Sequence, residues 1–381
     1  MANPLPRRVL ITGLNGYIAA HTAAVFLRAG YAVRGTVRRT RTPNVDSVVR
    51  ALAPYHDGNR LEVVEVPDIG ADGAFDRAVE GVQAIAHLAS PVSMTETDPT
   101  PMMRAAVQGT TSLLTSALAE STKPLSSSSS SSPLRSVVFM STISAIFSPN
   151  RPANHIFTEA DWNDAAEAAL QRLGKDTPGY VVYQASKTAA ERAFWRFAEE
   201  ERPRFGMVAL CPAPVLGPPF YLPTPLSSLS MRVRDIHNVL LGGPIPAFDS
   251  PVRGTFVDVR DVAELVLRSV EMDLSRSSQG KGPGDDNGDG GFTRERYLLV
   301  GQSGVSPKAM AEVLREGFPE RKGVIRTAGK AGEATGPVGL AATWRFDASK
   351  AGRLLGREWT GFRESVMDSA RAFITHDEES A

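Results

Sequence analysis

The sequence predicts an α/β protein with a doubly wound parallel sheet and a smaller C-terminal lobe. Up to Leu210, short apolar runs alternate with segments of helix length, which is the pattern of a parallel sheet covered by helices on both faces. The first apolar run leads directly into a glycine-rich turn. After Cys211 six prolines follow closely, and such a segment cannot be regular helix or central strand.

The alternation can be followed along the chain. Strands are expected at Val9–Ile11, Ala32–Val37, Leu61–Val66, Ala84–Leu88, Ser136–Met140 and Phe205–Leu210. Helices are expected at Gly16–Ala29, Asn44–Ala53, Gly73–Val79, Pro101–Glu120 and Tyr180–Glu201. Gly30 stands where glycine commonly ends a helix.

The C-terminal part is expected to combine both domains. Its elements are a strand at Tyr297–Val300 and helices at Met231–Leu241, Val259–Glu271, Pro307–Gly317, Asp347–Leu355 and Phe362–Phe373. Asp347 is the expected N-cap of its helix, and Gly356 the residue that closes it. We assign 1–215 to a dinucleotide-binding domain to which 252–272 and 296–301 return, and 216–251 and 305–381 to a substrate lobe over the carboxyl edge of the sheet.

Two segments interrupt the pattern. Residues 121–135 contain seven consecutive serines, Ser126 to Ser132, and 277–292 are rich in glycine and aspartate. Both are too polar to pack, so we expect flexible surface insertions. The second lacks the ligand positions and terminal Glu of an EF-hand loop, and we expect no metal site.

Composition narrows the class of protein. Of 381 residues 42% are hydrophobic, and the 42 basic residues balance 42 acidic ones, so we expect neither a nucleic acid nor an anionic membrane as partner. Cys211 is the single cysteine, which excludes an intrachain disulfide. The first residues lack a secretory signal, and no apolar run approaches the ~20 residues of a membrane span. We expect a soluble cytoplasmic protein.

The turn after the first strand predicts a dinucleotide site of the Rossmann type. Gly13 permits a tight turn, Gly16 lets the backbone approach a pyrophosphate, and the helix that follows offers free N–H groups. Ala19, at a position often taken by a third glycine, is small enough for close packing. The alternative is an ordinary βα turn. The expected contacts from this turn are Gly13, Asn15, Gly16, Tyr17 and Ile18.

The end of the second strand favours NADPH over NADH. An NAD site usually places an acid there to hold the ribose hydroxyls, whereas Val37 occupies the position here. Arg38 follows, and a guanidinium suits a 2′-phosphate by charge and by geometry. A solvated basic loop is the alternative, and for Arg39 it is the favoured one.

Tyr183 and Lys187 are the strongest catalytic candidates. Four residues apart, they share one face of the expected helix. Beside a nicotinamide, a Tyr whose pKa is lowered by an adjacent ammonium can protonate the oxygen of a carbonyl that receives a hydride. Tyr180 lacks such a partner, because Gln184 stands where its Lys would be. His87 and His155 are interpreted as structural.

These motifs together resemble the extended short-chain dehydrogenase/reductases, especially dihydroflavonol reductases, cinnamoyl-CoA reductases and fungal methylglyoxal or aldehyde reductases. The similarity runs from Val9 to about Glu271 and also rests on the motifs His87-Leu88-Ala89-Ser90-Pro91, Glu159…Trp162, Ala190-Glu191-Arg192…Trp195 and Phe256-Val257-Asp258-Val259-Arg260-Asp261-Val262-Ala263.

The resemblance implies further site residues. In relatives the fifth strand ends Thr-Ser-Ser and its last hydroxyl binds the substrate carbonyl; here Met140, Ser141 and Thr142 stand there, so Thr142 takes that role. Ser141 should point to the opposite side of the strand. The remaining implied cofactor contacts are Asp68 and Ile69 near the adenine, Leu88, Ala89 and Ser90 near the nicotinamide ribose, and Pro212 and Val215 near the carboxamide. Asp68 could alternatively cap a loop.

The sequence thus predicts an NADPH-dependent carbonyl reductase that acts on a small, apolar or aromatic ketone or aldehyde. Expected pocket walls are residues 90–94, 146–154, 220–226 and 231–241. One alternative is an epimerase, dehydratase or hydroxysteroid dehydrogenase of the same fold that uses NAD. Another is a non-catalytic NADPH sensor, although such proteins commonly lose the Tyr or the Lys.

Overall fold

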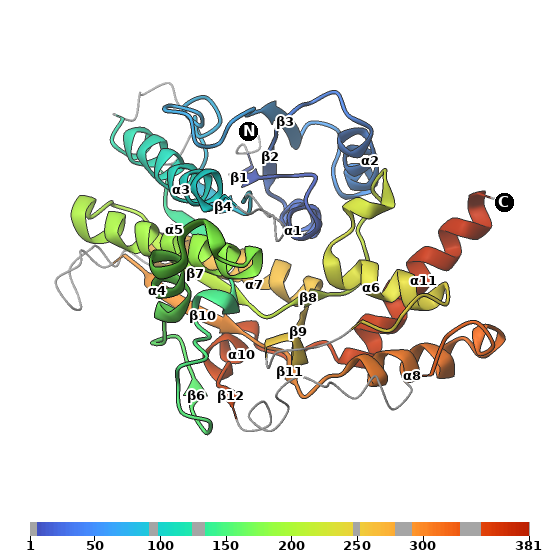
Figure 1. Cartoon of the computed structure of the whole chain (residues 1–381). Coiled ribbons are helices and arrows are strands. Elements are labelled where there is room, and N and C mark those ends of the chain that lie inside the picture. Colours follow the sequence, from blue (N-terminus) through green and yellow to red (C-terminus); the bar gives the residue numbers. More distant parts are fainter. Residues whose placement is uncertain are drawn as a thin grey trace.

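A computed structural model of the chain describes residues 6–90, 98–123, 134–246, 252–278, 292–327 and 344–380. Its centre is a seven-stranded sheet in the order β10-β7-β5-β4-β1-β2-β3, in which every neighbouring pair is parallel (Figure 1). The strands are β1 (Arg8–Thr12), β2 (Ala32–Val37), β3 (Leu61–Glu65), β4 (Ala84–His87), β5 (Ser136–Met140), β7 (Gly206–Pro212) and β10 (Arg294–Leu299). The order reverses between β1 and β4, which confirms the predicted doubly wound fold.

Helices cover both faces of this sheet. The helices are α1 (Tyr17–Arg28), α2 (Pro43–Leu52), α3 (Pro99–Ser121), α4 (Asp164–Leu173), α5 (Gly179–Glu201), α7 (Val259–Ser278) and α10 (Ser349–Leu355). Alternate residues of β1 enter different cores: Val9 and Ile11 pack in the core that contains α1 and α7, and Leu10 packs in the one that contains α3 and α5. Because both faces of the sheet are buried, its strands are continuous apolar runs.

A third hydrophobic core lies beside the sheet. It joins a three-stranded sheet, β11 (Gln302–Ser303), β9 (Thr255–Asp258) and β8 (Val215–Leu216), to helices α6 (Met231–Leu240), α8 (Pro307–Gly317) and α11 (Phe362–Ser380). Figure 1 shows α6, α8 and α11 together on one side of the molecule, away from α3 and α5. The chain that was expected to leave the nucleotide domain after Val215 therefore has a core of its own.

Most expected elements are present within a few residues of the predicted bounds, but one is wrong. The segment Gly73–Val79 forms successive turns instead of a helix, although Phe75 and Val79 are buried as the pattern required. Gly73 has φ +68°, a left-handed conformation that cannot start a right-handed helix. The spacing of the apolar residues therefore predicted their burial correctly, but the backbone conformation of Gly73 prevents the helix.

Smaller differences occur elsewhere. Ala348, not Asp347, is the N-cap of α10; the carboxylate of Asp347 instead accepts a hydrogen bond from the N–H of Ser349 at 3.0 Å. Gly356 closes this helix with φ +68°, as expected.

Helix α4, capped by Asn163, and the parallel pair of β6 (Ile156–Phe157) with β12 (Arg345–Phe346) were not predicted. The serine run and the segment Gly280–Gly291 lie outside the described residues. In the described chain, no helix combines the length and the apolar character that a membrane span needs.

Candidate active site

The predicted site residues meet at the carboxyl edge of the sheet. Four adjacent strands, in the order β7-β5-β4-β1, end at Pro212, Met140, His87 and Thr12. Because the strands are parallel, these ends lie side by side although they are widely separated in sequence. The glycine-rich turn follows β1 and the catalytic candidate Thr142 follows β5, so both border the point where the strand order reverses, the usual ligand site of such sheets.

The glycine-rich turn is shaped for a phosphate group. Gly13 has φ +73°, and a Cβ there would lie 3.2 Å from the Cα of Ala89, so the turn passes closely over the end of β4. The N–H of Gly16 donates to the Gly13 carbonyl at 2.8 Å and closes the turn. No side chain within the described residues caps α1, and its first turn carries no acid. The open N-terminus therefore fits an anion, as a pyrophosphate requires.

A hydroxyl locks this turn to the neighbouring strand. The Thr12 Oγ1 accepts hydrogen bonds from the N–H groups of Leu88 and Ala89, at 3.0 and 2.9 Å. Its own proton is then available for the Nδ1 of His87, 3.0 Å away. Burial, together with the charge of Lys187, lowers the pKa of His87 to about 3. His87 is thus a neutral acceptor inside the fold, in agreement with its structural interpretation.

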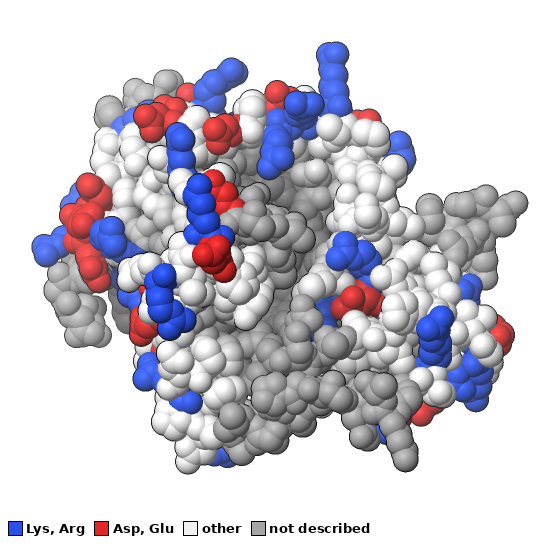
Figure 2. Space-filling model, viewed as in Figure 1, with Lys and Arg blue, Asp and Glu red and all other residues white. Residues whose placement is uncertain are grey.

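The expected adenosine contacts lie at the other end of the edge. Arg38 and Arg39 are exposed directly after β2, and Val37 at the end of β2 is buried. Figure 2 shows Lys and Arg side chains on the side of the molecule where α2 and β3 lie in Figure 1. The Asp68 carboxylate accepts from the N–H of Gly70 at 2.9 Å, which is the loop-capping role held as the alternative, and Ile69 packs against the core of α3.

The catalytic candidates face one another across the end of β5 and α5. Thr142 is buried in extended backbone directly after β5, and its side chain caps the short helical turn at Ile143–Ala145. Burial raises the pKa of the half-buried Tyr183 phenol, and a hydrogen bond with Thr142 opposes that shift. Tyr180, three residues earlier, is 60% exposed.

Lys187 is buried one turn further along α5. Its ammonium donates to the Ser90 hydroxyl at 3.3 Å and to the Met140 carbonyl at 3.1 Å. Desolvation lowers the pKa of Lys187 to about 8, and the carboxylate of Glu191 opposes that shift. The sequence-based expectation that Lys187 draws down the pKa of Tyr183 is not met in this arrangement, because the ammonium is engaged by Ser90 and Met140 and burial dominates at the phenol.

The expected carboxamide contacts also lie at this edge. Pro212 is the last residue of β7, and Val215 begins β8, where it pairs with Val257. The chain that follows crosses back over the glycine-rich turn. The Tyr17 hydroxyl donates to the Gly217 carbonyl at 2.7 Å, and the Tyr221 hydroxyl donates to the Asn15 carbonyl at 2.6 Å.

The same segment reaches the start of α2. Asn44 and Thr224 exchange two hydrogen bonds, of 2.7 and 3.1 Å, and Figure 1 shows this part of the chain running beside α2. These contacts were not predicted, because the paired residues are roughly 200 positions apart and the prolines indicated only irregular structure. They place 217–225 next to the dinucleotide turn.

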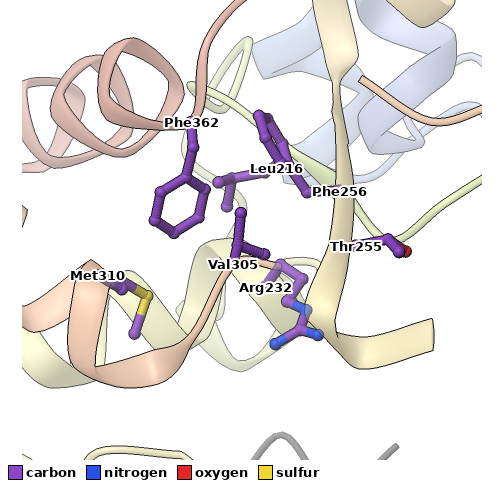
Figure 3. A pocket seen from close by; sticks show the side chains of 7 residues that line it. All are labelled: Leu216, Arg232, Thr255, Phe256, Val305, Met310 and Phe362. Carbon is purple, nitrogen blue, oxygen red and sulfur yellow. The ribbon is translucent and has the colours of Figure 1, made fainter. Parts of the chain in front are cut away.

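Several expected pocket walls prove to be core. Ile146 and Phe147 are buried, and Phe147 packs against Phe157 and Trp344. Val239 on α6 is fully buried in the third core, and Met94 lies outside the described residues. Figure 3 shows a pocket within that core, which is lined mostly by apolar side chains. Its lining residues are Leu216, Arg232, Thr255, Phe256, Val305, Met310 and Phe362. None of the catalytic candidates lines it.

Sequence reasoning gave no role to a buried carboxylate on the catalytic helix. Glu191, one turn after Lys187, is fully buried and accepts hydrogen bonds from Ser141 and Arg296. Its four-residue spacing from Lys187 was a visible signal. Among the described residues, no group of three or more His, Cys, Asp or Glu side chains is placed to hold a metal ion.

A doubly wound sheet with an open glycine turn and a Tyr–Lys helix at its carboxyl edge defines a dinucleotide-binding protein of the short-chain dehydrogenase/reductase type. The chain belongs to the NAD dependent epimerase/dehydratase family, whose model matches residues 9–279. The resemblance to extended short-chain dehydrogenase/reductases is thereby confirmed.

Relatives of this chain include several fungal proteins. It is 30% identical over 321 residues, 83% of this chain and 84% of the relative, to a putative uncharacterized oxidoreductase of Schizosaccharomyces pombe. It is 29% identical over 97% of its length to 98% of a ketoreductase of Aspergillus niger. Among solved structures, Gre2 of Candida albicans in complex with NADPH matches with a TM-score of 0.77 and 26% identity, covering 97% of this chain and 99% of that one.

Proposed function

We propose that the protein is an NADPH-dependent carbonyl reductase that converts a ketone or aldehyde to an alcohol, with Thr142, Tyr183 and Lys187 as its catalytic residues. The observation that carries this proposal is the convergence of these three side chains at the carboxyl edge of β5, beside the turn of Gly13. The ketoreductase and the NADPH complex among its relatives support it.

The residues present fit a dinucleotide. The turn at Gly13 leaves little room for a side chain, the start of α1 is open to an anion, and the Lys187 ammonium lies near the end of β4, where ribose hydroxyls would bind. The contacts we propose from the rest of the edge are Asn15, Gly16, Tyr17, Ile18, Arg38, Asp68, Ile69, Leu88, Ala89, Ser90, Pro212 and Val215. Arg38 would bind the 2′-phosphate, and the buried, apolar Val37 offers no carboxylate for NAD.

When bound, NADPH supplies the hydride that reduces the carbonyl carbon. The hydroxyls of Thr142 and Tyr183 would hold the carbonyl oxygen between them. Tyr183 transfers its phenolic proton to that oxygen, so that the carbonyl becomes an alcohol, and regains a proton from solvent. Lys187 would orient the cofactor ribose.

The protonation of Tyr183 favours the reductive direction. Burial raises the pKa of this phenol, so at neutral pH it carries the proton that reduction consumes. Oxidation of an alcohol would need the phenolate, which the same shift disfavours. We therefore propose that turnover from carbonyl to alcohol dominates at neutral pH.

For the substrate we propose a small ketone or aldehyde with apolar or aromatic groups. The chain after Val215 has its own apolar core next to the catalytic edge, which supports the assignment of 216–251 and 305–381 as the substrate lobe. An epimerase or dehydratase that uses NAD is the second candidate, favoured only by the name of the matched family. The exposed Arg38 and Arg39 at the end of β2 weigh against it.

The test is oxidation of NADPH and of NADH by the purified protein with aromatic, α-dicarbonyl and aliphatic aldehydes and ketones. Tyr183→Phe should reduce turnover by about 10²–10⁴-fold, the usual contribution of a general acid. Tyr180→Phe is the matched control, because Tyr180 lies in the same helix but is 60% exposed, and it should leave turnover unchanged.

The other outcomes separate the candidates. Equal turnover by Tyr183→Phe and the parent protein would exclude the proposed catalytic residue. Tight NADPH binding without turnover of any carbonyl would favour a sensor, and preference for NADH would overturn the role of Arg38.

A further inference from the structure

Three consecutive residues at the end of β5 contact three residues spaced by four along α5. The Met140 carbonyl accepts from Lys187, the Ser141 hydroxyl donates to Glu191 at 2.5 Å, and Thr142 hydrogen-bonds Tyr183. Residues four apart share a helix face, so one face of α5 contacts three successive residues, Met140 to Thr142. A displacement of α5 along β5 would break all three contacts together.

Further hydrogen bonds fix the position of Glu191. Its carboxylate is fully buried and receives two hydrogen bonds from the Arg296 guanidinium, at 2.6 and 3.1 Å, and one from Trp195 at 3.2 Å. Arg296 lies in β10, two strands from β5, with the Cys211 thiol of β7 between them. The carboxylate on α5 therefore contacts side chains from β10 and β7 and from the residue that follows β5.

Arg296 is itself held on its other side. It donates to the backbone carbonyls of Glu159 and Asp161, and its guanidinium lies 3.9 Å from the centre of the Trp162 ring. The carboxylate and the two carbonyls accept most of the hydrogen bonds that a guanidinium can donate, and the aromatic ring covers its face. The position of the Glu191 carboxylate is thus set by groups that take no part in the proposed reaction.

We propose that Glu191, held by Arg296, is a positioning residue of the active site: through Ser141 it fixes Thr142 opposite Tyr183, and through its charge it stabilises the ammonium form of Lys187. This inference rests on the proposed function for its catalytic consequence but not for its electrostatic one. Ser141 and Glu191 belong to two motifs of the chain, and neither touches the reacting atoms.

The charge of Glu191 matters because Lys187 is buried. Several groups interact with this ammonium from the elements around it: Glu191 on α5, His87 on β4, Cys211 on β7 and, behind Glu191, Arg296 on β10. Burial raises the pKa of the Cys211 thiol and leaves His87 neutral, so Glu191 is the anion among them. With the pKa of Lys187 already at about 8, loss of this anion would deprotonate the lysine near neutral pH.

Two variants separate the two roles. Ser141→Ala removes the hydrogen bond to the strand and keeps the charge; we expect kcat to fall about tenfold, the worth of roughly one hydrogen bond, with an unchanged pH profile. The double variant Glu191→Gln, Arg296→Met removes both charges together, because removal of Glu191 alone would leave a buried guanidinium unpaired. For it we expect the alkaline midpoint of NADPH binding, followed by cofactor fluorescence, to move down by about one pH unit. Glu199→Gln, an exposed position two turns further along α5, is the control for net charge.

A second readout does not depend on the cofactor. The difference in unfolding free energy between the protein and its Lys187→Met variant, measured across pH, reports the titration of Lys187 alone. In the Glu191→Gln, Arg296→Met background this difference should titrate about one pH unit lower. An unchanged titration in a folded double variant would overturn the electrostatic role, and undiminished kcat in Ser141→Ala would overturn the positional one. Failure of the proposed function would show separately, as equal turnover by Tyr183→Phe.

Discussion

The two halves of the catalytic edge are held by different kinds of interaction. At the ends of β1 and β4 the contacts are neutral: a glycine turn, the Thr12 hydroxyl and a His87 whose pKa lies at about 3. Beside β5 and β7, buried ionised groups of α5 and β10 dominate, namely Lys187, Glu191 and Arg296. A phosphate is held by backbone N–H groups and open space, whereas proton transfer needs charges at fixed positions. The first half should therefore be sensitive to volume and acid, and the second to charge and alkali.

The largest effect should come from Lys187→Met in the charged half. Turnover should fall by about 10³-fold, because the ammonium that orients the cofactor is lost. The variant should nevertheless be more stable below pH 8. The pKa of Lys187 is lowered from 10.5 to about 8, so its buried charge costs the fold about 3 kcal/mol below pH 8, and that cost disappears as pH rises towards 10.5.

Steady-state kinetics and chemical denaturation at neutral pH measure both quantities. If Lys187→Met loses stability together with activity, the lysine is a structural residue whose hydrogen bonds to Ser90 and Met140 outweigh its desolvation.

The neutral half predicts the opposite sensitivity. His87 has a pKa of about 3 in the folded protein and 6.5 as a free side chain, so between these values the unfolded chain binds a proton that the fold excludes. The stability due to neutral His87 is complete above pH 6.5 and is lost as pH falls towards 3, by about 3 kcal/mol at about pH 4.

Denaturation of the cofactor-free protein between pH 7 and about pH 4 measures this slope. His87→Asn retains an acceptor for the Thr12 hydroxyl and cannot take up the proton, so its slope should be shallower by about one proton. His21, whose burial lowers its pKa to about 4, contributes a second slope that His87→Asn should leave in place.

The difference between the halves also explains what the sequence could predict. Gly13, Gly16, Tyr183 and Lys187 act through spacing within one turn or one helix, so their placement follows from local geometry. The Glu191 network joins Ser141, Glu191 and Arg296, which meet only because β5, β7 and β10 are neighbours in the sheet. No local pattern carries that order, and for the same reason the contact of Asn44 with Thr224 was missed.

A volume change tests the neutral half directly. Gly13→Ala should weaken NADPH binding about 30-fold, since the left-handed backbone costs an alanine about 1–2 kcal/mol and its Cβ would lie 3.2 Å from the Cα of Ala89. Gly58→Ala is the matched control: Gly58 has φ +91° but faces open space, so the substitution costs similar strain without touching the site. Equal losses of NADPH affinity in both variants would mean that a general loss of stability, not the closeness of Gly13 to β4, weakens binding.

The smallest effect concerns a charge next to the neutral half, directly after β2. Arg38 is exposed, so its attraction for a 2′-phosphate is screened by salt, unlike the buried charges around Glu191. Arg38→Ala should reduce the preference for NADPH over NADH about tenfold in dilute buffer, at the low end for a charge-assisted hydrogen bond, and by less in molar salt. Arg50→Ala, which removes an exposed arginine from α2, should leave the preference unchanged. Fluorescence titrations with both cofactors at two salt concentrations measure this preference. A tenfold effect that persists in molar salt would mean that Arg38 is buried by the bound nucleotide. In that case charge would organise both halves of the edge.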